Sequence, residues 1–438
     1  MTTNHKYVLS VTAGLLLVAA TAGAEDPRVE AAAPAVVLRE YKSPNLHVHT
    51  DLAEEDAQRL FARLEMTLKF AARYWGRAPR GQIDCYVVDQ LDNWTDEQLP
   101  HRLARVIVGG VGGASVPEMI GRGQNARTVP TIFASSVPGI AEHEVVHAYC
   151  TQTFGSAGPA WYKEGMAEMV VRSCTRRSGL VCTPQQIAEL RKGQRATVRD
   201  VLSSGQTGNR IFTSLQKMWL DPKYQPRHIP LSAWTQRDRD NVALARREYL
   251  RTWAFCYMML HNPNYSKRFR TLGKNFVTGQ RASFDDLFGA AGEELVFEYA
   301  FFLKHVDTGY RVDLCRWDWH QRFQTMDRGE SCKIGVLAAR GFQASRITVV
   351  KGRHYAYETK GTWGTCAQTR VNADGGVDGS GQLIGAIMND YKIGEPFGLG
   401  CRGEWVAPAD GLLYLRCRDA WHELSDNHGQ VFIRFTGR

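Results

Sequence analysis

The 438-residue sequence lacks several patterns that mark other classes of protein. It has no run of about five Lys or Arg residues, although its formal net charge is +9, so a nucleic-acid partner is not indicated. It has no Gly-Lys-Ser/Thr sequence, so its glycine-rich stretch at 108–125 is not a phosphate loop. Beyond the N-terminus no apolar run reaches about 18 residues, so we expect no membrane span in the mature chain.

Ten cysteines occur without one Cys-x-x-Cys pair, which is unusual for a reduced cytosolic chain. The N-terminus explains this usage, because Lys6 precedes an apolar run and Ala22-Gly23-Ala24 then offers the small residues of a cleavage site. We therefore predict a signal peptide over 1–24, removed after Ala24, and a secreted or periplasmic protein. Residues 25–37 are rich in Ala and Pro and indicate a flexible leader. An even cysteine count suits disulfides, and Cys174 and Cys182, which enclose a short basic loop, are expected to pair.

The next segment alternates between strand and helix patterns. We predict strands at Leu46–Thr50 and Ile83–Val88 and, between them, a helix over 53–75 that ends before Gly76. The glycines of 108–125 indicate a mobile loop. Val129–Ala134 is predicted to be a strand at the edge of a sheet because it contains Pro130.

His47 and His49 face one side of their predicted strand. They could form a metal pair, but the sequence shows no third ligand. We therefore expect these two side chains to have surface or packing roles.

The remaining chain consists of two parts with different hydrophobic patterns. Residues 138–305 indicate mostly helices, whereas 346–438 show short alternating segments separated by Gly, Asn and Asp turns. This predicts an α+β protein with a first domain at 38–310, a connector at 311–345 and an all-β, jelly-roll-like sandwich at 346–438.

His143-Glu144-Val145-Val146-His147 is a His-Glu-x-x-His motif, which is rare by chance in a chain with 13 histidines. On a helix the two histidines lie one turn apart on one face, so both imidazoles can bind one metal ion. Glu144 lies about 100° round the helix and can reach a metal-bound water without binding the ion.

A catalytic zinc ion of this kind needs a third protein ligand. Glu164 follows His147 after a glycine-containing loop and a helix restart, at a distance that allows a return helix. Glu168 lies one turn further on the same face, where it can accept a hydrogen bond from a ligand histidine.

These two segments, His-Glu-x-x-His and then Trp-x-x-Glu-Gly-x-Ala-Glu, resemble the gluzincin zinc metallopeptidases, and in particular the bacterial peptidase-MA-like domains of unknown function. The resemblance covers about residues 40–308. It implies a small sheet plus a mostly helical part. It also implies His143, His147 and Glu164 as zinc ligands, Glu144 as general base, and Glu168 as the hydrogen-bond acceptor of a ligand histidine. It also implies that an extended peptide lies along the Val129–Ala134 strand.

An oxyanion partner in such enzymes is usually a Tyr or His from a later segment. Tyr249, Tyr257 and His261 are three candidates, and the sequence leaves the choice between them open.

The C-terminal segment 346–438 resembles the bacterial calcium-dependent galactophilic lectins. The matching segments include Gly361-Thr362-Trp363-Gly364 and the run from Asp419 to Gly429. The resemblance implies a calcium site at Asp419, Glu423, Asp426 and Asn427, and these oxygen-bearing residues suit calcium chemically. It also implies glycans as partners, although Arg418 stands where those lectins usually carry Asn.

Together these patterns predict an exported zinc metallopeptidase that hydrolyses peptide or protein substrates and is targeted by a glycan-binding sandwich. The alternative is a secreted carbohydrate-binding protein whose peptidase-like domain is inactive.

Overall fold

The computed structural model describes residues 12–13, 37–121, 127–174, 182–192, 197–204 and 206–438. Helices and sheets are both extensive, which confirms the α+β class. The chain forms two compact units, each assembled from three segments. Unit 1 comprises Met1–Arg177, Arg199–Tyr257 and Thr271–Ser283, and unit 2 comprises Ser178–Val198, Met258–Arg270 and Phe284–Arg438.

Unit 1 contains a mixed sheet with the strand order β1-β5-β6-β4-β3-β2. Strands β3, β4 and β6 are parallel, whereas β2 runs antiparallel to β3 and β5 antiparallel to β6. The strands are β1 (Thr12–Ala13), β2 (Arg39–Lys42), β3 (Leu46–Thr50), β4 (Ile83–Val88), β5 (Gly113–Ile120) and β6 (Arg127–Ser135).

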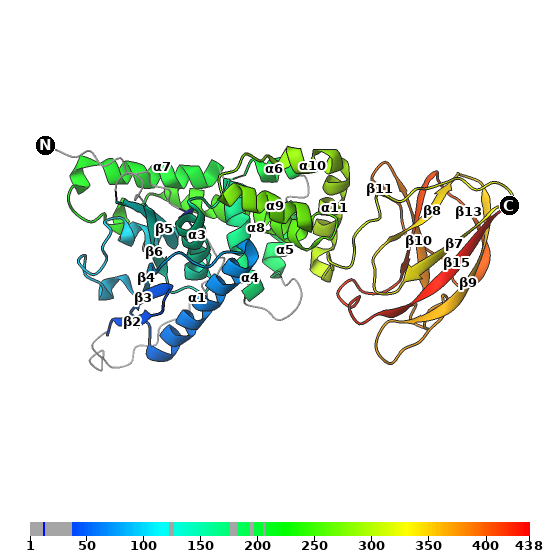
Figure 1. Cartoon of the computed structure of the whole chain (residues 1–438), viewed down its shortest axis with the longest axis horizontal. Helices are drawn as coiled ribbons and strands as arrows, with labels where there is room; N and C mark the ends of the chain where they lie inside the picture. The colour runs from blue at the N-terminus through cyan, green and yellow to red at the C-terminus, as the bar shows by residue number, and fades with distance from the viewer. Residues whose placement is uncertain (1–11, 14–36, 122–126, 175–181, 193–196, 205) are drawn as a thin grey trace. The chain divides into compact units, whose positions relative to one another are not determined.

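The helix α1 (Glu54–Trp75) has the predicted position and ends at Gly76, whose φ of 73° is left-handed. Its buried residues recur every three or four positions, as an amphipathic helix on a sheet requires. Helices α1 and α3 pack together against the sheet (Figure 1). The other helices with residues in unit 1 are α2 (Ala104–Val106), α3 (Ile140–Phe154), α4 (Ala160–Cys174), α6 (Val198–Leu202), α7 (Gln206–Leu220), α8 (Gln236–His261) and α9 (Ser266–Val277).

Two predictions in this unit are wrong. The segment 108–125 is not a loop where it is described, because Ile107–Val111 forms a π-helical turn and Gly113–Ile120 forms β5. The strand around Val129–Ala134 is not at the edge either, because β6 lies between β5 and β4. Pro130 is tolerated there because it faces Pro117 of β5, while pairing with β4 begins only at Thr131.

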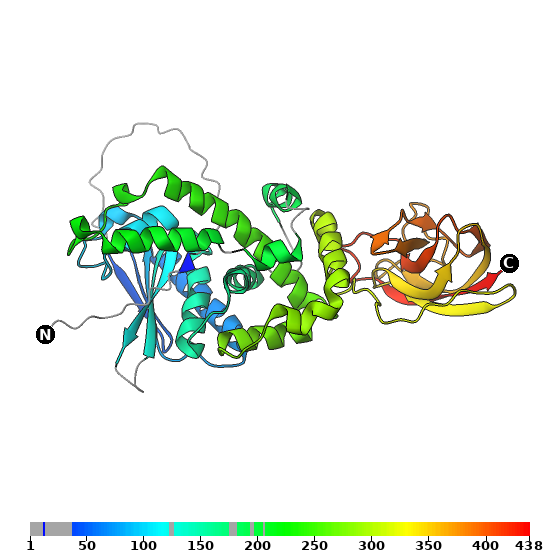
Figure 2. The ribbon, with the colours of Figure 1, turned by 90° about the horizontal axis from the view of Figure 1, so that it is seen from above.

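Unit 2 contains two antiparallel sheets, with the orders β11-β10-β14-β8 and β13-β9-β15-β7; β12 also pairs with β10. Their strands are drawn in yellow to red in Figure 2. Buried side chains from both sheets form a single apolar core. The strands are β7 (Ser331–Leu337), β8 (Gln343–Val349), β9 (His354–Gly364), β10 (Leu383–Asn389), β11 (Lys392–Ile393), β12 (Phe397–Gly398), β13 (Arg402–Val406), β14 (Gly411–Cys417) and β15 (His428–Gly437).

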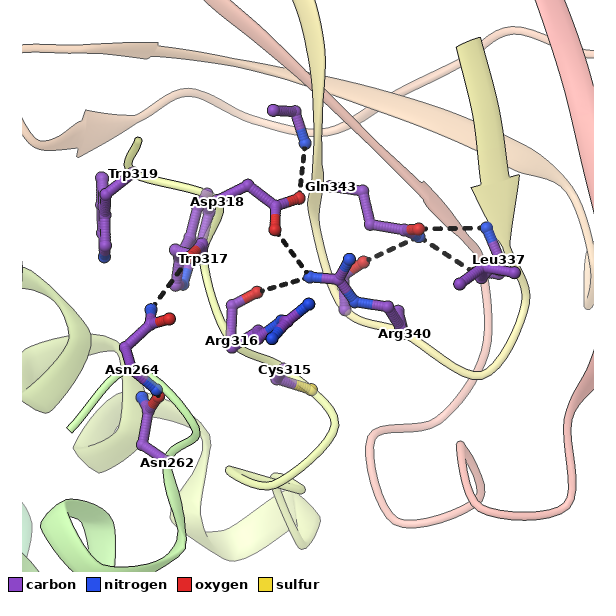
Figure 3. A network of polar contacts seen from close by, with 12 residues as sticks. Asn262, Asn264, Cys315, Arg316, Trp317, Asp318, Trp319, Leu337, Arg340 and Gln343 are labelled. Atoms are coloured by element: carbon purple, nitrogen blue, oxygen red, sulfur yellow. Dashed lines mark hydrogen bonds and ion pairs between the residues drawn. The ribbon is translucent and has the colours of Figure 1, made fainter. Parts of the chain in front are cut away.

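Unit 2 also contains the α-helices α5 (Pro184–Lys192), α10 (Phe284–Phe288) and α11 (Gly292–His305). The segment 311–345, expected to be a connector, contains β7 and the start of β8. Arg340 between those strands donates hydrogen bonds to Asp318 Oδ1 at 3.0 Å and to the carbonyl of Arg316 at 3.2 Å (Figure 3). Asn264 donates to the carbonyl of Trp317 at 2.9 Å, so this segment is an ordered part of unit 2.

Eight cysteines with described side chains are thiols, so the even cysteine count does not reflect pairing among them. They are Cys85, Cys150, Cys256, Cys315, Cys332, Cys366, Cys401 and Cys417. The predicted Cys174–Cys182 bridge lies outside the described residues, because the side chain of Cys174 is not among them. The predicted signal peptide and leader also lie outside them, except for β1 and the leader's last residue. Within the described part of the chain, no helix is long and apolar enough to cross a membrane.

Candidate metal centre

The His-Glu-x-x-His segment lies on α3, which begins where Gly139 adopts a left-handed φ of 93°. The backbone N–H of Gly139 donates to Glu142 Oε2 at 2.8 Å, and Arg63 donates to the other oxygen of that carboxylate at 2.6 Å. These contacts satisfy a free donor at the helix start and fix its position.

Three predicted ligands converge between α3 and α4. The Nε2 atoms of His143 and His147 are 2.9 Å apart, and Glu164 Oε2 lies 3.1 Å and 3.3 Å from them. Ligand atoms at tetrahedral angles about 2.1 Å from one ion stand about 3.4 Å apart, so a single ion would need only small shifts. All three side chains are at most 3% exposed.

The donor chemistry of the trio fits zinc. His143 Nδ1 faces Glu168 Oε1 at 3.1 Å, which directs a lone pair of the neutral ring's Nε2 atom toward the other two ligands. Two imidazole nitrogens and one carboxylate oxygen, with a fourth position for water or substrate, are the donor set of a catalytic zinc site.

The pKa values of the ion-free site follow from burial and neighbouring carboxylates. Burial opposes the charged form of His143, but contacts with Glu164 and Glu168 outweigh it and raise its pKa to about 10. Burial lowers the pKa of His147 to about 4. Burial also favours protonation of Glu164, yet His147 and His143 hold its pKa well below the usual range. In the ion-free site the His143 ring is therefore charged, with a proton on each nitrogen, and a cation that binds at Nε2 must displace the proton there.

Glu144 is fully buried beside the trio. The adjacent strand β5 comes close to it because Gly113 has no side chain: a Cβ there would lie 2.5 Å from Ile140 Cγ2 and 3.4 Å from Glu144 Cγ. Sequence reasoning took this glycine for part of a mobile loop. Its actual role is to let β5 approach the helix that carries Glu144.

Glu168 is held in place by a residue that the sequence interpretation missed. Arg172, one turn further along α4, places Nη2 3.3 Å from Glu168 Oε2, and its guanidinium lies over the Trp253 ring at 4.3 Å. The signal was present in the sequence, because Glu and Arg four residues apart on a helix form a common ion pair.

Gly165, next to Glu164, explains how α4 packs against α8. A Cβ at this position would lie 2.6 Å from both Cys256 Sγ and the carbonyl oxygen of Thr252. The Glu-Gly pair of the motif therefore combines a predicted ligand with close contact between helices.

The three oxyanion candidates lie in different surroundings. The Tyr249 ring is buried and stacks near His143, with centroids 6.2 Å apart. Burial, with the negative charges of Glu164 and Glu144, raises the pKa of Tyr249 well above its usual value, so its hydroxyl stays a donor. Tyr257 lies two turns further along α8, and His261 is exposed and belongs to unit 2.

In unit 2 the four predicted calcium ligands follow β14. Glu423 and Asp426 are exposed, whereas Asn427 is buried. Two buried oxygens, Asp419 Oδ2 and Asn427 Oδ1, have no hydrogen-bond partner among the described residues. Buried oxygens without donors are costly, and a hard cation such as Ca²⁺ would satisfy them.

No family model and no curated protein matches this chain. A solved structure described as the EclA N-terminal domain, a PllA-like lectin, is similar over 24% of this chain and 95% of its own, at 15% identity and a TM-score of 0.21. The IMPa metallopeptidase in complex with T-antigen is similar over 61% of this chain, at 13% identity and a TM-score of 0.18. IMPa from Pseudomonas aeruginosa in complex with an O-glycopeptide is similar over 85% of it, at 12% identity and a TM-score of 0.16.

This chain spans 29% and 35% of the two metallopeptidase structures, respectively.

Proposed function

We propose that this protein is an exported zinc metallopeptidase of the gluzincin type. The observation that carries the proposal is the convergence of His143 Nε2, His147 Nε2 and Glu164 Oε2 within 3.3 Å of one another, with Glu144 buried beside them. This arrangement joins a zinc donor set to a carboxylate that is not needed as a ligand.

The chemistry follows from these positions. Zn²⁺ bound by the trio would polarise the scissile carbonyl and lower the pKa of a water molecule. Glu144 accepts the proton of the attacking water and then delivers it to the leaving amine. The Tyr249 hydroxyl donates to the developing oxyanion, and Glu168 keeps His143 in its ligand tautomer.

Substrate access requires a movement, because the five side chains of the centre are at most 3% exposed. The strand β1 pairs antiparallel with β5 through Ala13↔Ala114 and Thr12↔Ser115. Removal of residues 1–24 would remove β1 too, leaving the edge of β5 open to an extended peptide. We therefore assign the peptide-binding strand to β5, in place of β6.

The experiment is to express residues 25–438 and measure zinc content and cleavage of a peptide library by mass spectrometry, with and without a chelator. Zinc-dependent cleavage that is lost in Glu144→Gln supports the peptidase. A protein that binds no zinc and cleaves no peptide, yet binds glycans, supports the alternative of a carbohydrate-binding protein.

The buried oxygens of Asp419 and Asn427 favour a second, accessory function in unit 2. Its two sheets would form a lectin-like sandwich that binds calcium through Asp419, Glu423, Asp426 and Asn427 and holds a glycan there. Calcium should raise the melting temperature of the wild type but not of Asp419→Ala, and should promote retention on a glycan array. If calcium leaves both melting temperature and glycan retention unchanged, this role is wrong.

A further inference from the structure

A second group of metal-ligand atoms lies on the β2–β3 side of the unit 1 sheet. Glu40 of β2 pairs opposite His49 of β3, and His47 lies two residues away on the same face. Glu40 Oε2 is 3.2 Å from His47 Nε2, and Glu40 Oε1 is 3.6 Å from His49 Nδ1. One ligand atom from each residue lies within 4.8 Å of the other two, so three residues that are separate in the sequence come together through strand pairing.

The two rings are oriented by neighbouring strands. His47 Nδ1 lies 3.1 Å from Asp84 Oδ1 of β4, which directs Nε2 toward Glu40. A carboxylate behind a histidine in this way is the usual support of a metal-binding imidazole. The His49 ring stacks on Tyr86 with centroids 4.5 Å apart and planes 4° apart, which restrains the plane of the ring whose Nδ1 faces Glu40 Oε1.

This group is separate from the His143 centre. Ala134 and Gly113 face α3, because a Cβ at Gly113 would meet Ala134 Cβ as well as Ile140 and Glu144. Ala134 is in register with Val87 of β4. Val87 and the residue two positions before it in β4 therefore point toward α3, because alternate residues of a strand share a face. Asp84 and Tyr86, with His47 and His49 opposite them, therefore point to the other face of the sheet.

The histidine side chains are 17% exposed and Glu40 is 55% exposed, so an ion can reach the group from solvent. Lys42 now occupies part of the space, with Nζ 3.1 Å from Glu40 Oε2. A metal ion would replace this surface ion pair, which costs little because exposed ion pairs contribute little to stability.

We propose that Glu40, His47 and His49 form a second metal site, which binds a divalent transition-metal ion such as Zn²⁺ and fastens the edge strand β2 to β3. Two imidazoles and one carboxylate suit borderline metal ions rather than Ca²⁺ or Mg²⁺. Asp84 is a positioning residue that acts through His47. The site stands independently of any peptidase activity.

Zinc titration of chelator-stripped protein, followed by calorimetry and by metal analysis after gel filtration, tests this site. Wild type should bind one more Zn²⁺ per chain than His47→Ala/His49→Ala, whatever the occupancy of the His143 centre. The matched control is His354→Ala, which removes an exposed histidine of unit 2 and should leave the stoichiometry at the wild-type value.

Finer variants separate a ligand site from an incidental cluster. Asp84→Asn should weaken zinc binding at this site by about 10–100-fold, whereas Lys42→Ala should strengthen it because the competing ammonium is gone. Glu40→Gln keeps the side-chain shape and should also weaken binding, which guards against misfolding of the double histidine variant. Equal zinc stoichiometry and affinity in wild type, His47→Ala/His49→Ala and Glu40→Gln would overturn the proposal.

Discussion

The Nδ1 atom of His143 lies 3.1 Å from Oε1 of Glu168, a residue one turn beyond Glu164 on α4. Replacing this acceptor in Glu168→Gln removes a negative charge and the preference for the ligand tautomer of His143. We expect zinc affinity at the His143 centre to fall by about 10–100-fold, with the fold intact. Competition with a chromophoric chelator measures this, and an unchanged affinity would show that Glu168 does not support the ligand.

Tyr249→Phe tests the oxyanion assignment. Loss of one oxyanion donor should lower kcat by about 10²–10³-fold, while zinc content and KM change little. Tyr257→Phe is the matched control, since that residue lies two turns further along α8. A larger loss in Tyr257→Phe than in Tyr249→Phe would reverse the assignment.

Gly165→Ala tests the contact between α4 and α8. The new Cβ would lie 2.6 Å from the Thr252 carbonyl oxygen, a backbone atom that cannot rotate away. The free energy of unfolding should fall by about 1–3 kcal/mol. The control is Gly292→Ala at the start of α11, where nothing lies within 4 Å and φ is −59°; there stability should hold or rise. Equal urea midpoints for the two variants would refute the packing argument.

Glu298 predicts a pH dependence in unit 2. Burial raises its pKa to about 7, although Trp319, Asn264, Asn262 and Tyr265 all donate hydrogen bonds to it. Between the reference pKa of 4.5 and about 7, the folded state holds a proton that the unfolded state releases. Stability from this group is therefore present below pH 4.5 and is lost as the pH rises toward about 7.

Glu298→Gln cannot titrate at this position. As the pH rises through the middle of this range, the unfolding free energy of the wild type should fall relative to that of the variant by about 1.4 kcal/mol per pH unit. Denaturant titrations at several pH values measure the shift, and a difference independent of pH would contradict the buried, protonated carboxyl.

Local patterns predicted much of unit 1, whereas long-range pairing was not predicted. The spacing of Leu60, Leu64 and Leu68 located α1, and the His-Glu-x-x-His motif placed two ligands because helix geometry is local. The position of β6 was missed because Pro130 faces Pro117, a pairing that sequence alone does not show. Glu40 escaped notice as a partner of His47 and His49 for the same reason.

The most direct test of the peptidase proposal compares wild type with Glu144→Gln after both are loaded with zinc. Glu144 supplies the base but no ligand, so both proteins should bind the same amount of zinc, and only the wild type should cleave peptides. General-base loss should reduce the rate by about 10²–10⁴-fold, and a chelator should abolish the wild-type activity. Cleavage by Glu144→Gln at the wild-type rate, or a wild type whose His143 centre takes up no zinc, would contradict the account.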